Sequence, residues 1–353
     1  MKRVWHITTI GLVLSVLLVA CAAPATTAPP APTSVPATSA PAATSAPAAT
    51  SAPATPTLKI AMLTSGPVTD EGWNQLAYQG LQALKTQGYT VANTENVAQA
   101  DQASDIESYI NQGFNVIVGH GFEYADALTA AAAKHPNDYF IQIGGVATAA
   151  NLKSYVFKPG EGGYVSGVLA AKLSKAHKFG FVGAVKIPTI EADELSYEQA
   201  VKAALPDATV VQGYSNDFSD INTAHEAALA QISAGVDFIL ANGDNANVGA
   251  INAIKEKGPS VLVIGWTLDQ SHLAPNNVAM SVVQRVDVLL QQAIADIQAG
   301  TFKGGNVTVG FKEGISDVSP FGPMVPADAQ AAVKQAVADL KAGKVTLPPI
   351  PSS

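Results

Sequence analysis

From residue 58 onward, short apolar runs alternate with longer segments in which hydrophobic residues recur at helical spacing. The apolar runs are rich in Val, Ile and Phe, which is typical of strands buried on both faces. We expect strands at 59–63, 90–93, 116–119, 139–143, 179–182, 209–212, 238–241, 261–264 and 306–311. We expect helices at 73–87, 103–112, 125–134, 194–204, 221–233, 246–257, 282–298 and 327–342.

The two halves of this pattern resemble each other. Residues 113–118 (GFNVIV) match 235–240 (GVDFIL), and in each half a helix ends on glycine, Gly113 or Gly235. Strands that alternate with helices predict parallel sheets covered by helices on both faces. We therefore expect an α/β fold of two doubly wound parallel-sheet lobes, with a ligand cleft between them. The expected boundaries are 58–165 plus about 285–353 for the first lobe and 166–284 for the second.

The first 57 residues predict a secretory signal peptide followed by a linker. Lys2 and Arg3 precede an apolar run at 10–20, so residues 1–20 are typical of a secretory signal peptide. Leu18-Val19-Ala20-Cys21 resembles a bacterial lipobox, which implies cleavage before Cys21 and a lipid on that cysteine; an ordinary signal peptide with an incidental cysteine is the alternative. The 21–57 segment, almost entirely Ala, Pro, Ser and Thr, predicts an extended linker. The globular part is then expected at the extracytoplasmic face of a membrane, periplasmic or at the cell surface.

Composition excludes several classes of partner and chemistry. The net charge is −8 and no basic stripe is visible, so we expect no nucleic-acid partner. A single cysteine allows no thiolate metal site, and no two histidines have metal-binding helical spacing, so we expect no metal. Neither a phosphate loop nor GxSxG occurs, and the glycines at 160–163 form only a weak dinucleotide motif. We expect no cofactor, no enzymatic activity and a monomeric protein.

Candidate binding residues follow the expected strands, because ligands of open α/β sheets bind at the carboxyl ends of the strands. The first lobe offers Ser65, Asp70, Trp73, Asn74, His120, Gly121 and Phe122. The second lobe offers Lys186, Asn242, Gly243, Asp244, Trp266 and Thr267.

Two of these candidates are tryptophans. Trp73 and Trp266 lie on one expected cleft loop each, and the third tryptophan, Trp5, lies in the expected signal peptide. Two such rings suit a flat ligand held by stacking, although each could instead fill core space beside its loop. The polar candidates also have structural alternatives, since Asp70 and Asp244 could cap the helices that follow and His120 could be a buried structural residue.

The order of several short motifs is similar to the basic membrane protein (BMP) family. The similarity covers nearly all of 58–349. It rests on Asp70, Trp73-Asn74-Gln75 and Gly80, on 157–167 (FKPGEGGYVSG), on 178–183 (KFGFVG) with Ile187-Pro188, on 264–270 (IGWTLDQ), and on Ser281 with Arg285-Val286-Asp287.

This resemblance implies a lipoprotein substrate-binding component of an ABC importer, with a periplasmic-binding-protein type I fold and an ABC permease as partner. In the family members that this chain resembles, an aromatic residue stacks on a purine base, and an aspartate and a lysine hold the ribose hydroxyls. Trp73 stands at the stacking position, whereas Thr267 and Gln284 stand at the aspartate and lysine positions. We therefore expect a small planar ligand, a purine nucleobase or nucleoside, without the usual hold on ribose. A sugar-like or other polar metabolite is the alternative.

Overall fold

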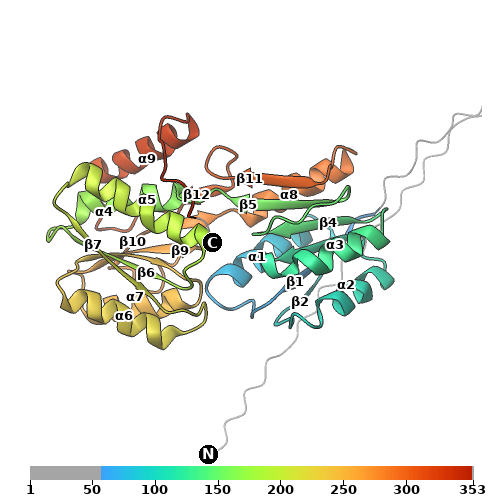
Figure 1. The fold of residues 1–353 in the computed structure, drawn as a ribbon, viewed down its shortest axis with the longest axis horizontal. Coiled ribbons are helices and arrows are strands. Elements are labelled where there is room, and N and C mark those ends of the chain that lie inside the picture. The colour runs from blue at the N-terminus through green and yellow to red at the C-terminus, as the bar shows by residue number, and fades with distance from the viewer. Residues whose placement is uncertain (1–56, 352–353) are drawn as a thin grey trace, which may run out of the picture. The chain divides into compact units, whose positions relative to one another are not determined.

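The computed structural model describes residues 57–351, which all belong to one compact unit. The expected signal peptide, Cys21 and nearly all of the linker lie outside the described residues. Two six-stranded sheets form the unit, one in each lobe (Figure 1). Their strand orders are β11-β5-β4-β3-β1-β2 and β12-β10-β9-β8-β6-β7.

The first sheet is parallel throughout. Its strands are β1 (Lys59–Thr64), β2 (Thr90–Thr94), β3 (Val116–His120), β4 (Tyr139–Ile143), β5 (Leu152–Phe157) and β11 (Gly305–Val309). Helices α1 (Trp73–Thr86) and α8 (Val286–Gln298) pack on one face, and α2 (Gln102–Asn111) and α3 (Ala125–Lys134) pack on the other. In α1 the buried residues Ala77, Leu81 and Leu84 recur every three or four positions, so one stripe of the helix faces the sheet.

The second sheet is parallel except for its short edge strand β12. Its strands are β6 (Lys178–Gly183), β7 (Thr209–Tyr214), β8 (Phe238–Asn242), β9 (Leu262–Thr267), β10 (Val278–Gln284) and β12 (Ser316–Val318). Helices α6 (Ile221–Ser233) and α7 (Ala246–Glu256) cover one face. Helices α4 (Glu161–Leu173), α5 (Pro188–Ala204) and α9 (Ala327–Lys341) cover the other. The expected α/β class, with two doubly wound lobes, is thus confirmed.

The C-terminal part of the chain differs from the expected boundary. Of the stretch that we assigned to the first lobe, α8 and β11 do lie there, but β12 pairs with β10 and α9 packs against α4 of the second lobe. Helix α4 likewise packs on α5, so the first lobe ends near 158 rather than at 165. The apolar stripe of α9 has the same period whichever sheet it covers, and the sequence pattern therefore could not assign it to a lobe.

Two element boundaries also differ from the sequence pattern. The helix expected at 282–298 begins at Val286, because the apolar residues before it continue the buried strand β10. The helix expected at 194–204 begins at Pro188, where the fixed φ of proline suits the first turn and its missing N–H is not needed. No helix within 57–351 is long and apolar enough to cross a membrane.

Candidate ligand-binding site

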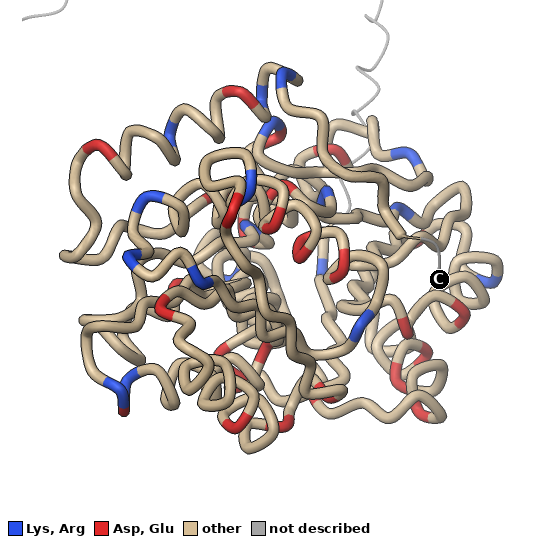
Figure 2. Tube along the Cα trace, turned by 60° about the vertical axis from the view of Figure 1, so that its left-hand side comes forward, with Lys and Arg blue, Asp and Glu red and all other residues tan. Residues whose placement is uncertain are grey.

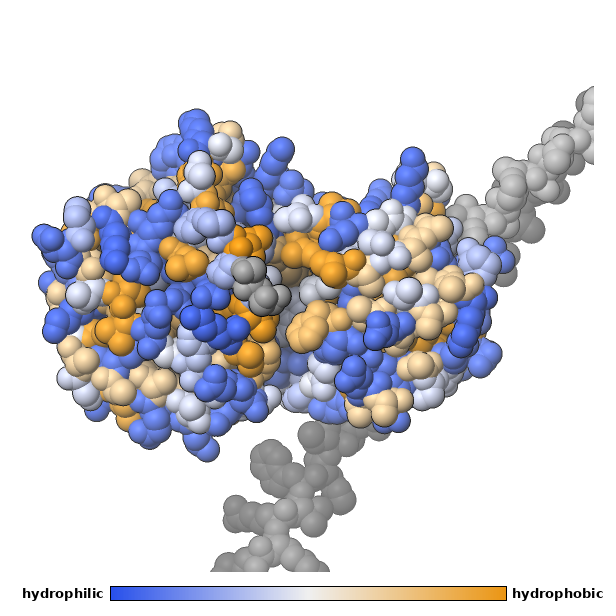
Figure 3. All heavy atoms as spheres, viewed as in Figure 1, coloured by the Kyte–Doolittle hydropathy of each residue, from blue (hydrophilic) through white to orange (hydrophobic). Residues whose placement is uncertain are grey.

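A cavity of about 570 Å³ lies between the two lobes. Residues that follow β1, β3 and β4 line it from the first lobe, and residues that follow β6, β8 and β9 line it from the second. Figure 3 shows hydrophobic side chains on both sides of the hollow between the lobes. The lining includes most of the residues expected from the sequence, namely Ser65, Trp73, Asn74, Gly121, Phe122, Asn242, Gly243, Asp244, Trp266, Thr267 and Gln284.

Trp73, the first residue of α1, is the central aromatic residue on the first-lobe side. Its ring stacks on His120, with centroids 3.9 Å apart and planes inclined by 25°. The edge-on ring of Phe157 lies 6.0 Å away. One face of the indole is therefore backed by protein while the side chain remains half-buried at the cavity wall.

His120 does not line the cavity, and it acts through Trp73. The imidazole is fully buried at the end of β3, and its Nε2 lies 2.9 Å from the backbone carbonyl oxygen of Trp73. A carbonyl only accepts hydrogen bonds, so Nε2 carries the hydrogen. Burial lowers the pKa of His120 to about 3, so the ring is neutral at physiological pH. His120 is thus a rigid, uncharged support for the tryptophan.

Two other expected residues also lie outside the cavity lining. Asp70 is buried and its carboxylate accepts hydrogen bonds from the backbone N–H groups of Asn74 and Gln75, both at 2.9 Å. It thereby satisfies the first turn of α1, which is the capping alternative left open by the sequence. Lys186 is exposed, and its Nζ lies 3.1 Å from Glu191 Oε1. It points to its ion-pair partner and not to the cleft.

Trp266 lines the cavity from the second lobe but is only 7% exposed. Its ring packs in the core cluster of that lobe, so closely against Gly162 that a Cβ atom there would lie 2.4 Å from the indole. The next residue, Thr267, has a φ of 69°, which is rare for a β-branched residue. Thr267 lines the cavity, so this strained backbone conformation lies at the cavity wall. The Thr267 hydroxyl donates to the backbone carbonyl of Trp266.

Asp193 is a cavity residue that sequence reasoning missed, because the helix that carries it was expected to begin one residue later. It lies on α5 and is 7% exposed. Its Oδ1 accepts hydrogen bonds from the backbone N–H groups of Gly160 (2.9 Å) and Gly163 (3.4 Å), and its Oδ2 lies 3.3 Å from Asn242 Nδ2. Burial and, as a smaller cause, the negative charge of Glu161 raise the pKa of Asp193 to about 7, against the opposing effect of these hydrogen bonds.

Asp244 follows β8 and faces the first lobe. Burial is the main cause that raises the pKa of Asp244 to about 8, and the negative charges of Asp70 and Glu123 add to it. The backbone N–H of Trp73 acts in the opposite direction. Two carboxyl groups of the cavity, on Asp193 and Asp244, are thus held near their protonation midpoints at physiological pH.

Two aromatic residues that line the cavity, Phe157 and Phe218, were not among the candidates from the sequence, because neither follows a strand end used to select them. Phe157 lies at the end of β5, a strand absent from the sequence prediction, and Phe218 lies on the loop after β7. Phe122, which was expected, is 61% exposed on the short turn after β3. The sequence FKPG at 157–160 could have indicated Phe157, because an aromatic residue there directly precedes a Pro-Gly turn.

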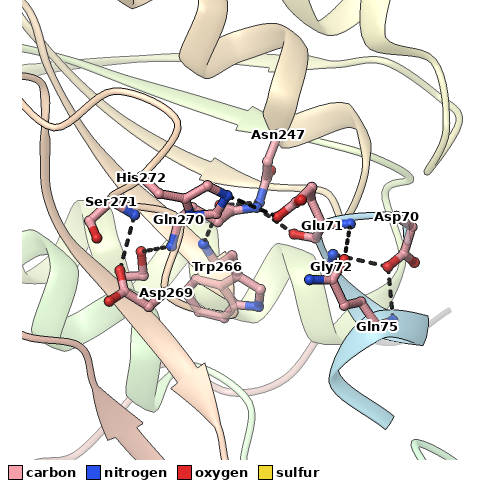
Figure 4. A network of polar contacts seen from close by, with 11 residues as sticks. Asp70, Glu71, Gly72, Gln75, Asn247, Trp266, Asp269, Gln270, Ser271 and His272 are labelled. Carbon is pink, nitrogen blue, oxygen red and sulfur yellow. Dashed lines mark hydrogen bonds and ion pairs between the residues drawn. The ribbon is translucent and has the colours of Figure 1, made fainter. Parts of the chain in front are cut away.

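A polar network joins the two lobes beside the cavity (Figure 4). The Gln270 side chain donates to the backbone carbonyl of Glu71 (2.9 Å) and accepts from the backbone N–H of Trp266 (3.1 Å). His272 Nε2 lies 3.2 Å from Glu71 Oε2. A Cβ atom on Gly72 would lie 2.8 Å from the Asp244 Cα, so glycine permits the close approach of the two loops.

Acidic groups outnumber basic groups at the cavity wall, whereas both signs are interspersed over the rest of the described chain (Figure 2). Among the described lining residues Lys158 is the one Lys or Arg, and its Nζ lies 3.0 Å from Glu161 Oε1. The lining carboxylates are those of Glu123, Asp193, Asp217 and Asp244.

The family model described as "ABC transporter substrate-binding protein PnrA-like" (Bmp) matches residues 57–338. The chain belongs to this family. Its class, expected from the resemblance, is thereby confirmed: it is a substrate-binding protein of the ABC transporter type, in a family that is not enzymatic.

Individual relatives agree with this assignment. Basic membrane protein A of Borreliella afzelii is 30% identical over 263 residues, which are 73% of this chain and 81% of that protein. The ABC transporter nucleoside-binding protein BmpA of Lactococcus lactis is 29% identical over 316 residues, covering 82% of this chain and 89% of that protein. Among solved structures, an ABC transporter solute-binding protein of Aeropyrum pernix has the same fold, with a TM-score of 0.74 at 22% identity, covering 84% of this chain and 94% of that one.

Proposed function

We propose that this substrate-binding protein captures a purine nucleobase or nucleoside between its lobes and delivers it to an ABC importer. The observation that carries the proposal is the geometry of Trp73. Its indole lines the cavity and is backed by a neutral, buried His120 ring 3.9 Å away. A fixed, half-exposed aromatic ring is a stacking platform, and a flat heterocycle that stacks on the face opposite His120 would add about 1–3 kcal/mol of binding free energy.

The second-lobe residues fit a nucleobase better than they fit a ribose whose hydroxyls are bound by an aspartate and a lysine. Thr267 and Gln284, which replace the charged pair that the family resemblance implies, both line the cavity and are both neutral. A diol loses charge-assisted hydrogen bonds when such a pair is absent. A relative, the Lactococcus BmpA protein at 29% identity, is named as nucleoside-binding, which supports a ligand of the nucleoside class.

The remaining parts of the proposal concern location. We propose that Cys21 carries a lipid and that the Ala/Pro-rich linker extends the two-lobed part from the extracytoplasmic face of a membrane. Replacing this residue (Cys21→Ser) should release the protein from the membrane fraction, and continued membrane association of the variant would contradict the anchor.

Ligand binding can be tested on the two-lobed part, residues 57–351, with purine bases, purine nucleosides and aldoses. A ligand that binds only the folded state stabilises it by about 2.7 kcal/mol at a hundred times Kd. We expect purines to raise the Tm and to quench tryptophan fluorescence, and quenching to persist in Trp266→Phe, where Trp73 is the remaining indole of 57–351. A rise in Tm with an aldose, and none with any purine, would refute the proposal and favour a sugar-like ligand.

A further inference from the structure

Five polar residues on the second-lobe side of the cavity carry a side-chain oxygen that can accept a hydrogen bond. We call these five residues the acceptor wall: Asp193, Asn242, Asp244, Thr267 and Gln284. The Thr267 hydroxyl donates its hydrogen to the Trp266 carbonyl, so only its lone pairs are left for a ligand. The side-chain oxygen of Gln284 is buried and has no hydrogen-bond partner among the described residues. An unmatched buried acceptor costs free energy, which a donor on a ligand would recover.

Asp193 is the most firmly fixed member of this wall. Two N–H groups at the N-terminus of α4, those of Gly160 and Gly163, hold its Oδ1, and Asn242 Nδ2 lies near its Oδ2. A Cβ atom on Gly163 would lie 2.0 Å from the Asp193 backbone oxygen, so α4 and α5 are locked together at this point. The carboxylate is therefore preorganised, and the N–H groups at the N-terminus of α4 favour its ionised form against the burial that raises the pKa of Asp193 to about 7.

Asn242 extends the same polar edge. Its Nδ2 is directed to Asp193, which leaves its side-chain oxygen as a second acceptor beside the carboxylate. Two neighbouring acceptors in a fixed arrangement match a ligand edge that carries two neighbouring donors. Such an edge occurs where a ring N–H stands next to an exocyclic amino group, as in guanine.

The charge of the cavity adds a second selection. Lys158, the one basic lining residue of the described chain, is already paired with Glu161 at 3.0 Å. A phosphate or carboxylate on the ligand would instead meet four acidic side chains, those of Glu123, Asp193, Asp217 and Asp244. Burial keeps Asp193 and Asp244 partly protonated, with pKa values of about 7 and about 8, so the repulsion by these two groups grows as pH rises. Like charges at close range in a partly desolvated cleft are strongly unfavourable.

We infer that the ligand is an uncharged or cationic planar heterocycle with a guanine-type donor edge, which Asp193 and Asn242 bind through its ring N–H and amino group. The inference rests on the proposed stacking on Trp73. Among purines, the site then binds 2-amino-6-oxo compounds more tightly than those that lack the 2-amino group. It also binds nucleosides and bases more tightly than nucleotides.

The test uses isothermal titration calorimetry with guanosine, inosine and guanosine monophosphate. Inosine lacks the 2-amino donor and keeps the ring N–H. We expect guanosine to bind roughly tenfold or more tighter than inosine, the effect of a hydrogen bond to a charged group. Guanosine monophosphate should bind at least about a hundredfold more weakly than guanosine. Equal affinities for guanosine and inosine, or binding of the monophosphate as tight as that of the nucleoside, would overturn the inference. Both readouts use the unaltered protein, so they remain decisive if a variant fails to fold.

Asp193→Asn sharpens the test, because the amide keeps the volume and removes the second acceptor. We expect the guanosine affinity to fall by about tenfold or more and the guanosine-to-inosine ratio to approach one. Glu198→Gln removes a carboxylate from the same helix outside the cavity, where the residue pairs with Lys202, and should leave both affinities unchanged. An unchanged ratio in Asp193→Asn would contradict the inference while leaving purine binding intact. If no purine binds even the unaltered protein, the proposed function itself fails.

Discussion

The two tryptophans of the cleft occupy corresponding places and have different surroundings. Trp73 stands half-buried on a loop-to-helix junction with His120 behind it, whereas Trp266 is 7% exposed and packs in the core of the second lobe. An aromatic ring that the core already holds on most sides has little surface for a ligand. We therefore propose that a ligand stacks on Trp73 and that Trp266 supports the cavity wall.

The same contrast extends to the two sides of the cavity. The first-lobe side offers a platform made of Trp73, Phe157 and the neutral His120, and the second-lobe side offers the acceptor wall. Stacking is tolerant of chemical detail because every base has a π-face, whereas directional hydrogen bonds discriminate between ligands. We infer that the first lobe supplies affinity for flat molecules and the second lobe selects among them.

The largest expected effect is on the free energy of unfolding, and it tests the structural role of Trp266. Trp266→Ala removes a large ring from the core cluster and should lower the free energy of unfolding by about 3–5 kcal/mol. Chemical denaturation at 25 °C measures it, with Trp266→Phe as the milder control. A loss of affinity without a loss of stability would reverse the roles assigned to the two tryptophans.

The next effect concerns the support behind Trp73. The pKa of His120 is lowered to about 3 in the folded state from its ordinary 6.5, so the unfolded chain binds the extra proton first as pH falls. The stabilising contribution of the neutral ring is complete above pH 6.5 and is lost progressively down to pH 3. Between pH 7 and pH 4 the free energy of unfolding that is lost through His120 amounts to about 3 kcal/mol.

Denaturation of the unaltered protein and of His120→Gln at both pH values isolates this contribution. Glutamine can still donate to the Trp73 carbonyl and does not titrate. We expect the variant to lose correspondingly less stability on acidification. An equal loss in both proteins would show that His120 is not the group responsible.

Removal of the platform itself should affect binding rather than folding. We expect Trp73→Ala to weaken purine binding by about 1–3 kcal/mol, or roughly ten- to a hundredfold in Kd, with a much smaller change in Tm than Trp266→Ala produces. Titration calorimetry with the tightest purine measures it, and Trp73→Phe should retain most of the affinity. Unchanged affinity in Trp73→Ala would refute the assignment of the stacking site.

The smallest expected effect tests whether the two sides of the cavity must approach each other. Gly72→Ala places a Cβ atom within 2.8 Å of the Asp244 Cα and should hold the loops apart. We expect ligand affinity to fall by about 1 kcal/mol, roughly fivefold in Kd, from local overpacking. Small-angle scattering should show a smaller compaction on ligand addition than in the unaltered protein. Full affinity with full compaction would show that this contact does not limit closure.

Most of the fold could be predicted from the chain because its signals are local. Buried parallel strands are continuous apolar runs, and the helices between them repeat their apolar positions every three to four residues. The predictions were least accurate where an element could belong to either lobe, as for α9 and β12, or where strand and helix join without an interruption in hydrophobicity, as at β10 and α8. A hydrophobic period records that a face is buried, not which partner buries it.

The sequence by itself determined that candidate ligand residues follow strand ends, since parallel strands place their carboxyl ends at one edge. It thereby identified Trp73, Asn242, Asp244 and Trp266, and the cavity is lined by all of them. Only the tertiary structure placed His120 behind Trp73, turned Asp70 to the first turn of α1 and brought Asp193 of α5 against the N-terminus of α4. The physical reason is that a residue type fixes what a side chain can donate or accept, whereas its partners, its burial and its pKa depend on segments distant in the chain.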